Sequence, residues 1–285
     1  MSPHIVLATA ADDPAITASD RLYAEALEQR GCRVTGAPWD GPGEAFAGAD
    51  AIVLRSTWGY YRALDAFKTW TEAMAASTRL FNSIDLVRWN LRKDYVEKLA
   101  AAGVRVPRSF LVPCEVSAIG RVFDRTGWAQ AVVKPASGAS GHSVELLQRA
   151  TWVEQIAGLA DEARRAGVVV QEFLPEIAEG ELSLVYFDGV FSHAIRKRPP
   201  AGEFRSNSRY RPTRTAETPP LDVTQQGAGC LITLPEVPLY ARVDGVVRNG
   251  VLIVIEVEVL EPALFLEFDS LSAERFAEAT LKRLG

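Results

Sequence analysis

Residues 251–262 read VLIVIEVEVLEP, an apolar run that carries acids at Glu256 and Glu258. Its β-branched residues are typical of a β-strand, in which successive side chains point to opposite faces. The two carboxylates are therefore expected on one face, with Ile255 and the valines that follow it on the other. Two like charges so close together in an apolar sheet raise the pKa of at least one of them unless a cation neutralises their charge.

Carboxylates paired in this way suit Mg²⁺ or Mn²⁺, hard ions that take oxygen ligands and usually keep substrate phosphates among them. The alternative is a half-buried antiparallel strand whose solvent-facing side is acidic, because alternating acids are common on such strands. A second apolar segment, 240–247, precedes this one across Asn249-Gly250, a pair that favours a tight hairpin turn. The hairpin brings Asp244 near the two glutamates as a third candidate metal ligand.

The composition is that of an ordinary globular protein: 285 residues, 48% of them hydrophobic and 24% charged. This length allows two domains, or one large α/β domain with an insertion. A net charge of −5 without a long basic run argues against a nucleic-acid partner. No apolar stretch is long enough to suggest a membrane partner, and the N-terminus does not resemble a signal peptide. Cys32, Cys114 and Cys230 form no CxxC pattern, which favours a reduced, cytoplasmic location.

The first part of the chain alternates strand and helix patterns, which predicts parallel strands joined by right-handed crossovers. Strands are expected at 5–8, 33–37 and 51–54, and a helix at 19–30. No GxGxxG follows the first strand, so a dinucleotide-binding fold has little support. Arg55-Ser56-Thr57-Trp58 follows the third strand, where parallel sheets often bind ligands, with a salt-bridged surface turn as the alternative. The nearby aromatics Tyr60 and Tyr61 are consistent with packing as well as with stacking on a ligand.

Residues 131–144, AVVKPASGASGHSV, carry a lysine from a strand into a loop of small residues. Small side chains let backbone N–H groups approach an anion closely, and Lys134 adds a positive charge beside them. The pattern is not a Walker A loop, because the lysine precedes the glycines and no GK[ST] follows. A plain Gly/Ser turn is the alternative, but Lys134 in front of the loop favours phosphate binding.

The remaining elements follow from local patterns. Further helices are expected at 64–75, 93–102, 117–125, 151–165 and 272–284. Further strands are expected at 110–112, 168–175, 182–187 and 190–195, the last two joined at Asp188-Gly189. Residues 198–220 are polar, proline-bearing and rich in arginine, and so long a structureless segment in a compact domain is usually functional or disordered.

The order of these motifs resembles the ATP-grasp superfamily: Lys93, VVKP with Lys134, SGASG, VQEFL, ARVD and IEVEVLEP. The resemblance runs from about Asn90 to Pro262, and the block before it looks like the N-terminal α/β domain of that superfamily. The glutathione synthetase and D-alanine–D-alanine ligase branch looks nearest. LRSTWGYY, LVRWN, GELSLVYFDGVFSHAIRK and EVLEPALFL look closer still to the bacterial group that contains the O-ureido-serine cyclo-ligase of the D-cycloserine pathway.

The resemblance implies an α/β (α+β) fold of ATP-grasp type in three parts. These are an N-terminal α/β domain at 1–90, a lid and linker at 91–175, and a C-terminal catalytic domain with an antiparallel sheet at 176–285. It also implies ATP and Mg²⁺ (or Mn²⁺) as cofactors, a small amino acid-like carboxylate as substrate, and a homodimer.

The resemblance also implies roles for individual residues. For ATP these are Lys93 and Lys134 at the phosphates, a covering loop of Gly138, Ala139, Ser140, Gly141 and His142, and an adenine-reading hinge of Gln171, Glu172, Phe173 and Leu174. Glu179 or Glu181, with Glu181 preferred, would hold the ribose. Asp244, Glu256 and Glu258 match the metal triad, although many relatives carry Asn at the third position. Arg242 and Lys134 are the expected catalytic residues.

The activity that the resemblance implies is ligation through an acyl phosphate, in which an amine attacks the activated carboxylate or a ring closes. The candidate substrate contacts are Arg55, Lys197, Arg205, Asn207 and Glu261, because cations suit a carboxylate and an acid suits an amine. Two other classes remain open. One is a phosphotransferase that stops after moving phosphate, and the other is a nucleotide-binding sensor without turnover.

Overall fold

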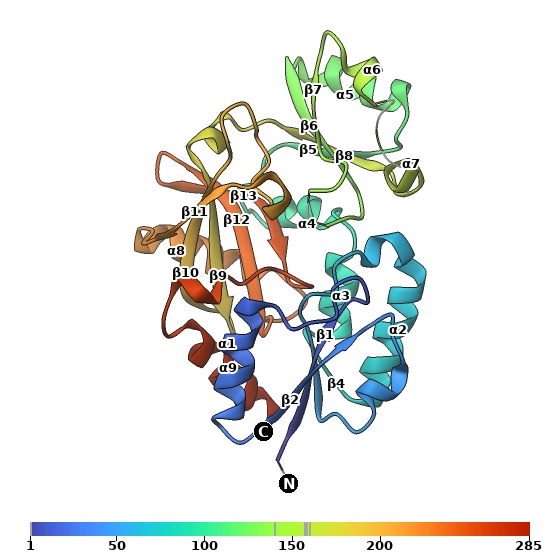
Figure 1. Ribbon diagram of the computed structural model, residues 1–285. Coiled ribbons are helices and arrows are strands. Elements are labelled where there is room, and N and C mark those ends of the chain that lie inside the picture. Colours follow the sequence, from blue (N-terminus) through green and yellow to red (C-terminus); the bar gives the residue numbers. More distant parts are fainter. Residues whose placement is uncertain (1, 140, 157–158, 160) are drawn as a thin grey trace.

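The computed structural model describes residues 2–139, 141–156, 159 and 161–285. Its strands form three sheets, each built from one part of the sequence (Figure 1). The sheets fall within the predicted parts 1–90, 91–175 and 176–285, and the division into domains at these boundaries stays a prediction. In the described part of the chain, no helix has the length and apolarity that crossing a membrane requires.

The first sheet is parallel, in the order β2-β1-β3-β4. Its strands are β1 (His4–Thr9), β2 (Arg33–Pro38), β3 (Ala51–Leu54) and β4 (Arg79–Phe81), and its helices are α1 (Ala18–Glu28), α2 (Leu64–Ser77) and α3 (Ile84–Asn90). Every residue of β1 is buried, as expected for a parallel strand covered on both faces. The C-terminal helix α9 (Ser272–Leu284) returns to pack on α1, where the rings of Tyr23 and Phe276 stack 3.8 Å apart (Figure 1).

The middle sheet is antiparallel, in the order β5-β8-β6-β7. Its elements are β5 (Ser109–Val112), α5 (Val116–Thr126), β6 (Gln130–Pro135), β7 (Glu145–Gln148), α6 (Trp152–Gln155), α7 (Asp161–Ala166) and β8 (Val168–Glu172), preceded by α4 (Tyr95–Ala101). The single helix expected at 151–165 is wrong, because α6 ends at Gln155 and Leu159 lies in a bend. The sequence between them contains Gly158, and glycine in a helix interior costs about 1 kcal/mol relative to alanine.

The third sheet is antiparallel, in the order β11-β10-β9-β12-β13. Its elements are β9 (Glu181–Phe187), β10 (Val190–Arg198), β11 (Thr213–Glu217), α8 (Leu221–Leu231), β12 (Tyr240–Arg248) and β13 (Val251–Glu258). The prediction that 198–220 lacks structure is wrong in part, because β11 pairs with β10 from Thr213 to Glu217. This edge strand is polar on both faces, so the sequence shows no hydrophobic alternation that would identify it.

A β-bulge interrupts the hairpin of β12 and β13. Asp244 pairs with Glu256, but Gly245 pairs with Val254, so Ile255 is an extra residue in β13. Glu256 and Glu258 do share a face, as expected, but Ile255 joins them on that face, and the prediction that it lies opposite them is wrong. The bulge shifts the alternation by one residue, because two successive residues of the bulged strand face one residue of its partner.

Candidate active site

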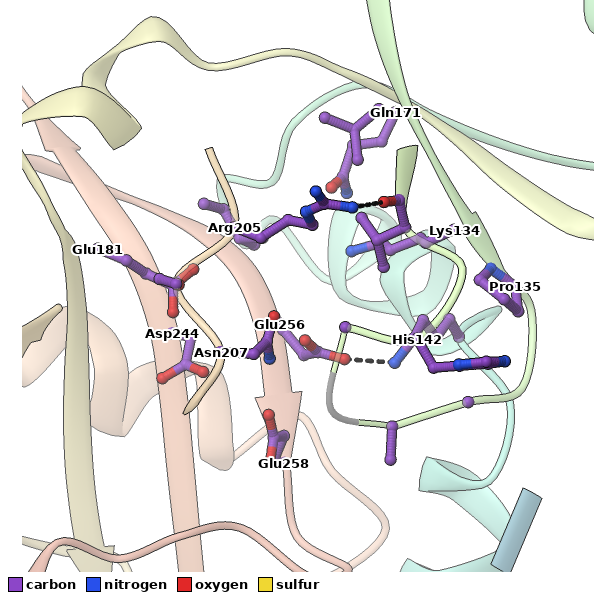
Figure 2. Close-up of a pocket in the computed structure, with 18 of the residues that line it drawn as sticks. Lys134, Pro135, His142, Gln171, Glu181, Arg205, Asn207, Asp244, Glu256 and Glu258 are labelled. Atoms are coloured by element: carbon purple, nitrogen blue, oxygen red, sulfur yellow. Dashed lines mark hydrogen bonds and ion pairs between the residues drawn. The ribbon is translucent and has the colours of Figure 1, made fainter. Parts of the chain in front are cut away.

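A cavity of about 1120 Å³, its open mouth included, lies between the middle and third sheets. Its walls come from β6, β8, β9, β12 and β13, from the loop at 138–144 and from 204–207. Figure 2 shows Asp244, Glu256 and Glu258 on one side of this space and Lys134 on the other. The predicted site residues that line it are Lys93, Lys134, Gly138, Ala139, Gly141, His142, Gln171, Glu172, Phe173, Leu174, Glu181, Arg205, Asn207, Asp244, Glu256, Glu258 and Glu261.

One end of the cavity is apolar. Its lining includes Phe173, Leu174, Ile177, Phe204 and Ile255, which belong to one hydrophobic cluster. The bulge at Ile255 contributes to this surface, since it turns an apolar side chain toward the cavity directly before the acids. This end suits a flat apolar ring.

The other end is charged and is centred on Asp244, which is 3% exposed. Its carboxylate accepts hydrogen bonds from Ser183 Oγ at 2.6 Å, from Arg242 Nε and Nη2 at 2.9 Å each, and from Lys197 Nζ at 3.2 Å. Burial raises the pKa of Asp244, but Arg242 and Lys197 outweigh it and hold the pKa well below its ordinary value. Lys197 also pairs with Glu181, so one buried cation links β10 to both carboxylates.

The two glutamates of β13 differ in their charge balance. Glu256 pairs with Lys93, and burial of Glu256 is outweighed by Lys93 and Lys134, so its pKa is lowered. Glu258 pairs with Arg242, which is shared with Asp244. Burial, helped by the charges of Glu256 and Asp244, therefore raises the pKa of Glu258 to about 7. The raised pKa expected for at least one of the paired acids is thus found at Glu258.

The carboxylate oxygens of Asp244, Glu256 and Glu258 fit a hard divalent cation by their chemistry, and such a cation would hold Glu258 in its charged form. Asp244 and Glu256 face each other in register on paired strands. In the described residues, however, no three acidic, histidine or cysteine side chains already form a metal-holding group. Lys93 and Arg242 occupy the carboxylates instead, so a bound ion would displace these ammonium and guanidinium groups.

Lys134 has a different environment from the other cations of the site. It is 5% exposed, and no hydrogen bond or ion pair to its ammonium occurs among the described residues. Burial lowers the pKa of Lys134, although the charge of Glu256 partly offsets this effect. Lys134 lines the cavity and its Nζ is not among the buried polar atoms that lack a partner, so the ammonium is accessible from the cavity, where an anionic ligand would pair with it.

The loop at 138–145, here called the lid loop, is held by residues 203–210, here called the strap. Arg205 Nη1 donates to Val144 O at 2.9 Å, and Tyr210 Oη donates to Gly141 O at 3.3 Å. Arg205 also forms a two-point ion pair with Glu203 and lies 4.0 Å from the centre of the Tyr210 ring. The predicted substrate contact Arg205 is thus engaged with protein groups. Ser140, predicted in the loop, lies outside the described residues.

Four of the described residues predicted for the site do not line the cavity: Lys197 and Arg242, which pair with Asp244, and Arg55 and Glu179. Arg55 is 2% exposed and donates to Asp20 Oδ1 and to Pro262 O, each at 2.8 Å, so the prediction that it contacts substrate is not supported. Arg55 follows the end of β3, and its side chain points toward the third sheet. There its guanidinium carbon lies 5.0 Å from the centre of the Tyr240 ring. Glu179 is exposed at the end of a short 3₁₀ turn, whereas Glu181 begins β9 inside the cavity.

Two side chains that hold the open edge of β13 were not predicted from the sequence. Asn90 Nδ2 donates to Val257 O at 2.8 Å, and Val259 N donates to Asn90 Oδ1 at 3.0 Å. Val257 N donates to Tyr95 Oη at 3.3 Å. These side chains take the place of a neighbouring strand and fix the segment that carries the acids. The LVRWN motif contains Asn90, but only the sheet order reveals that β13 is an edge strand.

The comparisons with known proteins agree with this geometry. Residues 5–82 match the family described as "D-cycloserine synthetase DcsG, N-terminal domain", and residues 97–225 match "Prokaryotic glutathione synthetase, ATP-grasp domain". The chain is 33% identical over 261 residues to the cycloserine biosynthesis protein DcsG of Streptomyces lavendulae, covering 82% of this chain and 83% of that protein. It is 29% identical over 272 residues to the glutathione synthetase of Parasynechococcus marenigrum (strain WH8102), covering 88% of this chain and 81% of that protein.

A crystal structure of D-cycloserine synthetase DcsG superposes with a TM-score of 0.88 at 28% identity, covering 99% of this chain and 100% of that chain. The predicted fold, with a parallel N-terminal sheet and an antiparallel C-terminal sheet, is confirmed. The chain therefore belongs to the ATP-grasp ligases, enzymes that use ATP and Mg²⁺ to join a carboxylate to an amine.

Proposed function

We propose that the protein activates a small amino acid-like carboxylate as an acyl phosphate and then lets an amine displace the phosphate, in a second molecule or in a ring closure. The observation that carries this proposal is a single cavity in which Lys93 and Lys134 meet Glu256 and Glu258 beside an apolar slot. The chain also resembles a cycloserine biosynthesis protein, which favours ring closure over peptide-bond formation.

The apolar slot of Phe173, Leu174 and Ile255 suits the adenine of ATP, and Glu181 is the candidate for the ribose. Lys93 and Lys134 lie where phosphates would follow, and the ammonium of Lys134, which lines the cavity without an ion-pair partner among the described residues, supports this role. An anion binds a desolvated lysine strongly because little water competes.

Asp244, Glu256 and Glu258 would hold Mg²⁺, which supplies positive charge to the phosphates when bound. Lys93 and Arg242 would then be released from Glu256 and Glu258 and could contact phosphate oxygens. Arg242 remains next to Asp244 on the same strand face, so its guanidinium stays within the site.

Phosphoryl transfer needs alignment and charge neutralisation more than covalent help from the protein. A substrate carboxylate oxygen attacks the γ-phosphorus, and ADP leaves. The nitrogen of an amine then attacks the carbonyl carbon of the acyl phosphate, phosphate leaves and the nitrogen loses a proton. Contacts of the strap with the lid loop, such as Arg205 to Val144, support exclusion of water, which would otherwise hydrolyse the intermediate.

A homodimer, a cytoplasmic location and the lack of a nucleic-acid or membrane partner stay predictions. Cys32, Cys114 and Cys230 are all free thiols, which supports a reducing compartment.

The two other classes make different predictions. A phosphotransferase would need the same lysines and acids but no second nucleophile. A sensor would not need to keep Asp244, Glu256 and Glu258 together, and their presence in one cavity argues against that class.

The deciding experiment is ADP formation with a panel of amino acids and other small carboxylates, including both enantiomers of O-ureido-serine, followed by product mass. Joining two substrates with loss of water supports intermolecular ligation, and consumption of a single substrate supports ring closure. A product equal to substrate plus phosphate would show a phosphotransferase. No ADP with any acid would overturn the ligase proposal.

A further inference from the structure

The segment that joins α3 to α4, residues 90–95 and here called the brace, lies along the outer edge of β13. Its first and last residues hold that edge. Asn90 Nδ2 donates to Val257 O at 2.8 Å, and Val259 N donates to Asn90 Oδ1 at 3.0 Å. Tyr95, which is 1% exposed, accepts from Val257 N at 3.3 Å through its hydroxyl. In the strand order of the described residues β13 comes last, so these side chains take the place of a neighbouring strand.

The brace also connects both lysines of the cavity to the acids. The side chain of Lys93 pairs with Glu256, while its backbone N–H donates to Ala136 O at 2.7 Å. Ala136 directly follows β6, two residues after Lys134. One short segment therefore sets the positions of Lys93, of the strand that carries Lys134 and of the acids of β13 relative to one another.

The contacts of the brace with β13 differ in whether they can coexist with a bound metal ion. The Lys93 ammonium would leave Glu256, since it occupies the carboxylate that the ion needs. Among the described residues, the hydrogen bonds then left between the brace and β13 are those of Asn90 and Tyr95. They join neutral groups, so a cation beside the acids does not compete for them. Contacts that orient metal ligands from outside the coordination sphere are commonly needed for full metal affinity.

We propose that Asn90 and Tyr95 are positioning residues that hold the acids of β13 in place for the divalent ion once the Lys93 ammonium has left. They act through the backbone of the strand and touch neither the ion nor the reacting atoms. Their loss should therefore weaken metal binding itself, beyond any loss of stability. The inference rests on the metal site of the proposed ligase and adds the residues that position its ligands.

The other end of β13 provides a matched control. Gln226 of α8 makes the same kind of two-point contact: its Nε2 donates to Gly250 O at 3.0 Å, and Leu252 N donates to its Oε1 at 2.9 Å. Asn90 and Gln226 are both half-buried, but the contacts of Gln226 lie at the turn between β12 and β13, away from the acids. Asn90→Leu and Gln226→Met each remove one carboxamide and its two hydrogen bonds at similar side-chain volume.

The test measures Mn²⁺ binding from the electron paramagnetic resonance signal of the free ion, with adenylyl imidodiphosphate as an unreactive nucleotide. Asn90→Leu is expected to raise the Mn²⁺ dissociation constant by about 10- to 100-fold. Tyr95→Phe should raise it by a smaller factor, because it removes one hydrogen bond, and it tests the same point if Asn90→Leu does not fold. Nucleotide binding in EDTA, measured by calorimetry, should stay unchanged in both. Gln226→Met should melt at a lower temperature, as Asn90→Leu does, but keep the Mn²⁺ affinity of the wild type.

Three results would overturn the positioning role. They are wild-type Mn²⁺ affinity in Asn90→Leu and Tyr95→Phe, an equal loss of affinity in Gln226→Met, which would show general loosening of the hairpin, and weaker nucleotide binding in EDTA. The last would make Asn90, which also lines the cavity, a nucleotide contact.

Glu256→Gln separates this inference from the proposed function. If Glu256→Gln loses Mn²⁺ affinity and Asn90→Leu keeps it, the positioning role fails and the metal site stands. If Glu256→Gln binds Mn²⁺ like the wild type, the metal site fails and the positioning role fails with it. A wild type that forms no ADP with any acid but shows the expected Mn²⁺ results would refute the ligase reaction and support the positioning role.

Discussion

The strap and the hairpin of β12 and β13 carry their charges in opposite ways. In the strap, Arg205 binds Glu203 through two contacts of 2.9 Å and lies farther, at 3.7 Å, from Glu145, and the pairing lowers the pKa of Glu203 to about 2. In the hairpin of β12 and β13, Arg242 serves both Asp244 and Glu258. Burial therefore raises the pKa of Glu258 to about 7.

The difference indicates which end performs chemistry. Charges that are paired within the protein hold a segment in place, as the strap holds the lid loop through Arg205. Carboxylates that strand register forces together without enough cations attract a positively charged ligand instead. The hairpin is therefore the expected site of metal binding and phosphoryl transfer, and the strap the element that closes the cavity.

The largest expected effect comes from removing charge at the hairpin end. Lys134→Ala and Glu256→Gln are each expected to reduce kcat for ADP formation by about 100- to 1000-fold, the usual cost of removing one electrostatic contact from a transition state. Steady-state assays with saturating ATP and acid would measure the loss, and melting temperatures should show that both variants fold.

Lys98→Ala is the control for this comparison. The Lys98 side chain is 59% exposed, and its ion pair is a long i,i+4 contact of 3.8 Å from Nζ to Asp94 Oδ2. It should keep full activity. Near-normal turnover by both Lys134→Ala and Glu256→Gln would contradict the assignment of the hairpin end.

Local patterns were enough to predict the gathering of Asp244, Glu256 and Glu258. The alternation along β13 and the turn at Asn249-Gly250 act over a few residues, so the sequence carries them directly. The position of Lys134 opposite the acids depends on two different sheets, and only the resemblance to a known fold made it predictable.

Other features depend on partners that are distant in the sequence. Arg55 was predicted at a ligand site because it follows a parallel strand, but its partner Asp20 lies 35 residues away. Ile255 was placed on the wrong face because its bulge is a property of the pairing with β12. In both cases the strand itself was predicted correctly from the local pattern. The place of the side chain was not, because it depends on a contact with a distant part of the chain.

Gly245 tests whether this bulge positions the acids, and the expected effect is of intermediate size. A Cβ at Gly245 would lie 2.4 Å from Ile253 O and 3.2 Å from Leu252 Cδ1. Because Ile253 O belongs to the backbone of β13, Gly245→Ala would shift the strand that carries Glu256 and Glu258. We expect unfolding free energy to fall by about 1–3 kcal/mol and kcat to fall with it.

Gly229→Ala is the matched control, since Gly229 is an exposed residue of α8 with open space where a Cβ would lie. It should leave kcat unchanged and stabilise the protein by roughly 0.5–1 kcal/mol, because alanine favours a helix interior. Urea denaturation and ADP assays on both variants would measure these effects. Wild-type stability in Gly245→Ala would show that the bulge does not require glycine.

The smallest expected effect concerns the pH dependence of stability in the metal-free, nucleotide-free protein. The contributions of the hairpin and of the strap to the unfolding free energy should change with pH in opposite directions. Glu258 holds its proton more tightly when folded, since its pKa rises from 4.5 to about 7, so unfolding free energy should fall as pH rises through that window. Glu203 has a lowered pKa, so its contribution is complete above its ordinary value of 4.5 and is lost as pH falls toward about 2. Glu258→Gln should reduce the first change, to which Glu181 and Glu261 also contribute through their raised pKa values, and Glu203→Gln should remove the second, each effect on the order of 1 kcal/mol. Denaturation at several pH values would measure both contributions. If the two slopes of unfolding free energy against pH had the same sign, the contrast between a surplus of acid at the hairpin and paired charges in the strap would be wrong.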